Sequence, residues 1–232
     1  MKTSQVKISI FQIAEKLFGK NFVRKLYTNH CTRLFQEAGV IFIHIPKVGG
    51  TSIAHKLFGK RAGHDSALKV KDVLGEDAFK KMYSFSVVRN PYDRLVSAYH
   101  YAIQGGGSDG GIRRRPVYRT NLFATFSMFV HNWLILQDPE EIEIIFRPQH
   151  YFICDKEDNI LVKWVGKIEN IDEVEHRISA ELGKPIKLSR RNTTRRKHYS
   201  KYYDEELQQL VYNYFKRDFE LFGYPKQIEG LN

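Results

Sequence analysis

The sequence is poor in cysteine and has no long apolar run. Its two cysteines, Cys31 and Cys154, lie far apart among 232 residues, which excludes a disulfide framework and a cysteine-rich zinc site. No apolar stretch approaches the ~18 residues of a membrane span. Near the N-terminus, Gln12, Glu15 and Lys16 interrupt the apolar positions and no small-residue cleavage site follows, so we expect an amphipathic helix rather than a signal peptide. A cytoplasmic protein is therefore the expected default.

Acidic residues are also scarce relative to basic ones. Asp and Glu total 26 against 37 Lys and Arg, which leaves a formal net charge of +11. Such an excess attracts anions, among them nucleic acids, acidic glycans, phosphorylated cofactors and anionic lipids. The sequence has no zinc-finger pattern and no RNP-type aromatic motif, which weighs against a nucleic-acid-binding protein, the main rival class.

What the sequence does contain is an alternation of buried-strand and helix patterns. Hydrophobic residues make up 42%, enough for a real core, and apolar runs predict strands at 40–45, 83–88 and 160–169. We therefore predict a three-layer α/β fold with a central parallel sheet, with residues 1–39 as a helical segment packed on a single domain of residues 40–232. The expected helices are two within 6–38, then 52–58, 70–82, 91–102, 122–136, 171–182 and about 204–222.

The motif "PKVGGTS" follows the first predicted strand and opens a helix. A glycine turn at this point presents free backbone N–H groups to an anion, and Gly49 and Gly50 permit close approach. Thr51 and Ser52 add hydroxyl donors, and Lys47 adds a full charge. The Walker A pattern G-x-x-x-x-G-K-[ST] is absent, which disfavours a nucleotide kinase or other NTPase. Taken alone, the motif would also fit a glycine turn with an incidental lysine.

A second motif, "VVRNPYDRLVSAY", follows the second predicted strand. It provides Arg89 at the strand end and Ser97 about two turns into the next helix. Both residues can lie at the carboxyl edge of the sheet, where ligands of open α/β folds bind. The pair therefore suits a second phosphate, although singly the two residues would also fit a helix cap and a small packing residue.

Together the two motifs resemble those of sulfotransferases that use 3′-phosphoadenosine 5′-phosphosulfate (PAPS). "PKVGGTS" is similar to their 5′-phosphosulfate loop and "VVRNPYDRLVSAY" to their 3′-phosphate motif. The match is closest to the carbohydrate branch, which includes heparan sulfate 2-O- and 6-O-sulfotransferases and their bacterial relatives. "NILVKWVGKIENIDEV" and the C-terminal "YYDEELQQLVYNYFKRDFELFGY" also resemble that branch, so the likeness covers roughly residues 40–224.

The resemblance implies a P-loop-NTPase-like sulfotransferase fold and a bacterial-type cytoplasmic enzyme, with a trimmed Golgi-lumenal domain less favoured. It also implies PAPS as the donor, no metal, and in-line transfer to a carbohydrate hydroxyl or, alternatively, to a small hydroxylated metabolite. Arg89 and Ser97 would bind the 3′-phosphate, and Lys47 would also stabilise the leaving group. The residues implied to bind the 5′-phosphosulfate are Lys47, Gly49, Gly50, Thr51 and Ser52.

An acceptor hydroxyl must lose a proton, and histidine is the natural base near neutral pH. Among nine histidines we favour His64 as the general base, because "HDSAL" resembles the pattern of the 6-O-type enzymes in the same interval. An exposed loop histidine without a role is the simpler alternative. His150, in "RPQHYF", is the second choice and is expected to line the acceptor cleft.

Two basic clusters complete the candidate residues. Arg113, Arg114 and Arg115 follow a glycine-rich stretch and are expected to recognise an acidic acceptor. The segment "RRNTTRRK" would close over the nucleotide, with Arg191 and Thr194 as contacts. For most such runs the simpler interpretation is a solvated, charged loop.

Overall fold

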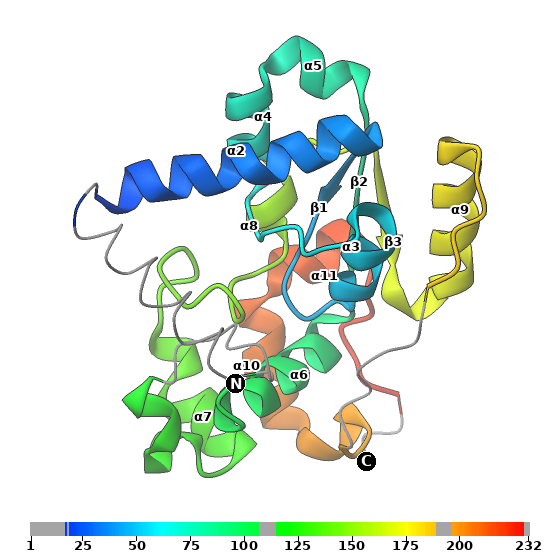
Figure 1. Cartoon of the computed structure of the whole chain (residues 1–232). Helices are drawn as coiled ribbons and strands as arrows, with labels where there is room; N and C mark the ends of the chain where they lie inside the picture. Colours follow the sequence, from blue (N-terminus) through cyan, green and yellow to red (C-terminus); the bar gives the residue numbers. More distant parts are fainter. Residues whose placement is uncertain (1–16, 18, 107–114, 189–195, 230–232) are drawn as a thin grey trace.

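The computed structural model describes residues 17, 19–106, 115–188 and 196–229 (Figure 1). Over these residues the sheet has three parallel strands in the order β1-β2-β3, with Phe85 opposite both Phe42 and Trp164. Every residue of β1 is buried, as expected for a parallel strand covered on both faces. The predicted α/β fold with a parallel sheet is therefore confirmed. The strands are β1 (Val40–Ile43), β2 (Tyr83–Val88) and β3 (Trp164–Lys167).

Helices surround this sheet, with α2 packed beside β1 and α9 beside β3 (Figure 1). None of the helices in the described ranges is long and apolar enough to cross a membrane. The α-helices are α2 (Lys20–Ala38), α3 (Gly50–Phe58), α4 (Ala67–Leu74), α5 (Glu76–Lys81), α6 (Pro91–Ile103), α7 (Phe126–Asn132), α8 (His150–Ile153), α9 (Ile171–Leu182), α10 (Glu205–Tyr214) and α11 (Lys216–Phe222). The 3₁₀ helices cover Pro116–Arg119, Asn121–Phe123, Leu134–Leu136, Ile168–Asn170 and Tyr199–Tyr202.

Several predicted elements are shorter or divided. The third strand begins at Trp164 rather than at 160, because Ile160 instead forms an isolated antiparallel bridge with Cys154. The helix predicted over 70–82 is divided into α4 and α5 at Gly75, whose φ of 84° lies outside the helical region. Of the two short helices expected within 6–38, the first falls on residues that lie mostly outside the described ones, and α2 occupies the rest of that range.

The described residues form two buried hydrophobic clusters, and helix α6 joins the second to the sheet. The first cluster surrounds the sheet, and the second is rich in aromatic rings from α7, α10 and α11. Tyr92, in the first turn of α6, is fully buried, and its hydroxyl donates to the carbonyl of Lys226 at 2.5 Å. Tyr203 in turn donates its hydroxyl to the carbonyl of Tyr92 at 3.0 Å. The start of α6 is therefore held firmly at the carboxyl end of β2.

Candidate active site

The loop between β1 and α3 has an unusual backbone. Lys47 has a φ of 71° and Gly49 a φ of 76°, both in the left-handed region. For a residue with a Cβ this conformation costs roughly 1–2 kcal/mol, so the surroundings must hold it in place. Two arginines do so: Arg94 Nε donates to the carbonyl of Pro46 at 3.0 Å, and Arg89 Nη1 donates to the carbonyl of Lys47 at 3.1 Å. Residues of the second motif therefore hold the backbone conformation of the first.

Helix α3 begins at Gly50 with its first turn open to a ligand. Gly49 is the N-cap and no side chain caps this helix; the N–H of Ser52 donates to the Gly49 carbonyl at 3.2 Å, and no side chain takes the N–H groups of Gly50 and Thr51 as a cap. A Cβ on Gly50 would overlap the ring of His44 and crowd that of Phe42. Gly50 is therefore needed for the helix to start so close to the strand. Thr51 and Ser52, as predicted, occupy the same turn and are partly buried.

The Lys47 side chain lies against helix α6. Its Nζ is 3.9 Å from the ring centroid of Tyr101, a cation–π contact. Burial, together with repulsion from Arg89, Arg94 and Arg196, lowers the pKa of Lys47 to about 8. A proton on Lys47 would be held more firmly once an anion entered the site, since the anion offsets this repulsion.

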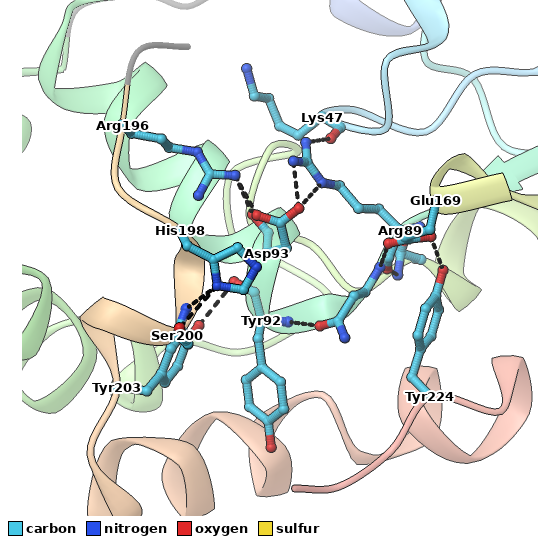
Figure 2. Close-up of polar contacts among 12 residues, drawn as sticks. Lys47, Arg89, Tyr92, Asp93, Glu169, Arg196, His198, Ser200, Tyr203 and Tyr224 are labelled. Carbon is cyan, nitrogen blue, oxygen red and sulfur yellow. Dashed lines mark hydrogen bonds and ion pairs between the residues drawn. The ribbon is translucent and has the colours of Figure 1, made fainter. Parts of the chain in front are cut away.

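Arg89 is fixed by a carboxylate on the first turn of α6. Its Nε and Nη2 donate to Asp93 Oδ2 at 2.8 and 2.6 Å, and the other oxygen, Oδ1, accepts from Arg196 (Figure 2). Ser97 follows Asp93 at the i,i+4 spacing that places residues on one face of a helix, and it is 6% exposed.

Arg191 and Thr194 lie outside the described residues. Arg196, from the same basic run, is the residue that the structure shows beside Arg89 and Asp93 (Figure 2).

His64 is held at the end of β1 by a backbone group. Its Nδ1 lies 2.8 Å from the carbonyl oxygen of His44, and the two rings have centroids 4.3 Å apart. Because a carbonyl only accepts, Nδ1 carries the hydrogen and Nε2 of the neutral ring keeps its lone pair. The pKa of His64 lies below the ordinary 6.5, because the protein atoms around the ring desolvate the charged form. His64 nevertheless keeps solvent-exposed surface, so its ring can be reached from solvent.

Residues 32–225 match the sequence model of the Sulfotransferase family. The chain belongs to the sulfotransferase family. No curated protein and no solved structure matches the chain. The family match covers both motifs, the sheet and most of the helices, and it confirms the expected P-loop-like α/β fold and a sulfotransferase enzyme.

In this sulfotransferase the residues of "RPQHYF" contact other parts of the protein. The side chain of Gln149 pairs with the backbone of Arg89, since Oε1 accepts from its N–H and Nε2 donates to its carbonyl, both at 2.9 Å. His150 is only 7% exposed, and its Nδ1 lies 2.8 Å from Asp218 Oδ1. Asp218 is fully buried and also accepts from the backbone N–H of Gln149 at 2.7 Å. This is the usual placement of a core histidine, and the expected contact between His150 and an acceptor stays a prediction.

Arg115 lies at the far end of α6 in the sulfotransferase. It pairs with Glu143, which also accepts from the hydroxyl of Tyr118 at 2.9 Å. A hollow of about 200 Å³ lies here, lined by the end of α6 and by Arg115, Tyr118 and Arg119. Arg113 and Arg114 are outside the described residues. Within the described part of the chain, no group of three or more His, Cys, Asp or Glu side chains could hold a metal ion.

Proposed function

We propose that this sulfotransferase moves the sulfuryl group of PAPS to a hydroxyl of a carbohydrate acceptor, with His64 as the base. The observation that carries the proposal is the cation cluster beside the start of α3, where Lys47 is close enough to Arg89 and Arg196 to be repelled by them and Asp93 pairs with both arginines. Such an excess of positive charge suits a ligand with several anionic groups. Sulfotransferases in general use PAPS, which supplies an activated sulfuryl group and carries a separate 3′-phosphate.

The residues present fit that donor. Arg89 and Ser97 are proposed for the 3′-phosphate, because Arg89 directly follows β2 and pairs with Asp93, and Ser97 lies on the face of α6 that carries Asp93. Lys47 is proposed to stabilise charge on the leaving oxygen, a role that suits a partly buried ammonium. The proposed 5′-phosphosulfate contacts are Lys47, Gly49, Gly50, Thr51 and Ser52.

His64 is proposed to take the proton of the acceptor hydroxyl at Nε2. Its Nδ1–H is held by the His44 carbonyl, which sets both the tautomer and the direction of the ring. His44 lies only three residues before Lys47, so the base and the leaving-group lysine are attached to the same strand end. The arrangement supports in-line transfer dominated by positioning, in which no protein nucleophile is needed.

A carbohydrate acceptor is supported by the resemblance of the motifs to the carbohydrate branch, and a small hydroxylated metabolite is the alternative. Arg115 and the hollow beside it lie about one turn beyond Tyr101, the residue that contacts Lys47, so they are proposed to border the acceptor. The bacterial relatives in that branch are the reason for proposing a bacterial-type cytoplasmic enzyme. The division into residues 1–39 and a sulfotransferase domain of 40–232 is likewise a proposal.

Incubation with sulfur-labelled PAPS and a panel of polysaccharides, glycolipids and small alcohols would identify the acceptor by the labelled product.

Donor selectivity gives the direct test of the proposed function. We expect isothermal calorimetry to show binding of 3′-phosphoadenosine 5′-phosphate (PAP), and at least about tenfold weaker binding of ATP, which lacks the 3′-phosphate that Arg89 is proposed to bind. An oligonucleotide serves as the control for non-specific attraction to the net charge of +11, and raised salt should weaken its binding steeply. Binding of the oligonucleotide without binding of PAP would contradict the proposal and favour a nucleic-acid-binding protein.

The pH dependence of transfer should be bell-shaped. His64 must be neutral to accept a proton. Its pKa lies below the ordinary 6.5, so kcat/KM for PAPS should fall on the acid side only as the pH drops below 6.5 and through that lowered pKa. Lys47 must be charged, so kcat/KM should also fall as pH rises past its pKa of about 8. Lys47→Arg should move the alkaline limb upward if it is active, since arginine stays charged. An alkaline limb unmoved in an active Lys47→Arg variant would show that another group titrates.

A further inference from the structure

We propose that Asp93 is a positioning residue of the donor site, whose carboxylate holds Arg89 and Arg196 together; the inference rests on the proposed function. Each carboxylate oxygen serves a different arginine: Oδ2 accepts from Arg89 Nε and Nη2 at 2.8 and 2.6 Å, and Oδ1 accepts from Arg196 (Figure 2). The backbone carbonyl of Asp93 lies 3.5 Å from the same Arg196 nitrogen. One short side chain thus links β2, α6 and the segment that follows residue 195.

The burial of these groups makes the link strong. The side chains of Arg89 and Asp93 are 22% and 20% exposed, and that of Arg196 is 10% exposed. Ion pairs so shielded from solvent are screened less than surface pairs, and an arginine left without its partner there is costly. Without the carboxylate, the two guanidinium groups would repel each other and also Lys47, and at least one would turn away.

A capping role does not account for Asp93. It lies in the first turn of α6, where a negative charge favours the helix, but the cap itself is Asn90, whose Oδ1 accepts from the N–H of Tyr92 at 3.0 Å. The Asp93 oxygens are directed to arginines instead. Through Arg89 Nη1 the same carboxylate supports the left-handed backbone of Lys47. Asp93 therefore acts on the phosphosulfate loop through Arg89 and on the C-terminal part through Arg196.

The direction in which PAP affinity changes when Asp93 is replaced distinguishes a positioning role from a purely electrostatic one. Removing a negative charge beside an anion site would, by electrostatics alone, tighten binding of PAP. If Asp93 positions the arginines, Asp93→Asn should instead weaken PAP binding and raise the KM for PAPS by about tenfold, with a smaller change in kcat. Asp93→Glu should restore part of the affinity, since it keeps the charge. The loss in Arg196→Gln should not add to that in Asp93→Asn, because both break the same link.

Glu76→Gln is the matched control. Glu76 also bridges two cations, Lys71 at 3.2 Å and Lys80 at 2.9 Å, but it lies on α5, well away from α6 in Figure 1. It should leave PAP affinity unchanged.

Unchanged or tighter PAP binding in a folded Asp93→Asn protein would overturn the proposal. If that variant fails to fold, as judged by circular dichroism, the PAP affinity of Arg196→Gln decides, and an unchanged value there would overturn the proposal. Failure of the proposed function is distinguishable, because the unaltered protein would then not bind PAP at all.

Discussion

His64→Ala is expected to lower kcat for sulfuryl transfer by about 10²–10⁴-fold and to leave the affinity for PAP unchanged. This is the usual contribution of a positioned general base, and the proposed role of His64 lies in the proton of the acceptor rather than in the donor. The structure supports it with a fixed tautomer, through the 2.8 Å contact to the His44 carbonyl, and with a pKa lowered by desolvation. The measurement is transfer of labelled sulfate under saturating PAPS, with calorimetry for PAP.

Chemical rescue gives this prediction a readout that a structural role would not share. Added imidazole should restore part of the activity of His64→Ala, because it can occupy the space of the lost ring and accept the proton. His176→Ala, an exposed histidine on α9, is the matched control and should retain full activity. Activity of His64→Ala near that of the unaltered protein would show that another group is the base.

Lys47→Met is expected to lower kcat/KM for PAPS by about 10²–10³-fold, the usual cost of losing one donor aimed at developing negative charge. Methionine keeps an unbranched apolar stem against Tyr101 and removes only the ammonium. It also keeps a Cβ at the φ of 71°, so the backbone requirement of the loop is unchanged.

Thermal stability should respond to this change in the opposite direction to activity. The lowered pKa of Lys47 means that the folded state disfavours its charge, so an uncharged side chain should leave the melting temperature unchanged or raise it. Lys56→Met, an exposed lysine on α3, should alter neither activity nor stability noticeably. Full activity in Lys47→Met would contradict the proposed leaving-group role, and a large loss of stability would contradict the electrostatic description of the loop.

The features that the sequence predicts well are those encoded over a few neighbouring residues. The apolar runs before "PKVGGTS" and "VVRNPYDRLVSAY" predict two strands, because a parallel strand buried on both faces needs little polar alternation. The glycine turn, the N-cap at Asn90 and Pro91 at the first helical position predict where α3 and α6 begin. Division of a helix at Gly75 was the kind of local detail that periodicity alone missed.

By itself, then, the sequence determined the parallel α/β fold, the sulfotransferase motifs and His64 as a candidate base, since each depends on a short local pattern. Only the tertiary structure decided that Arg94 and Arg89 bond to the backbone of the loop between β1 and α3 and that Asp93 joins Arg89 to Arg196. It also decided that Gln149 contacts the Arg89 backbone and that His150 pairs with Asp218. Apart from the Arg89–Asp93 pair, which is four positions apart, these contacts join residues 42 to 103 positions apart. Which charged or polar side chain becomes buried, and against which partner, depends on how the helices pack around the sheet, and no local pattern carries that information.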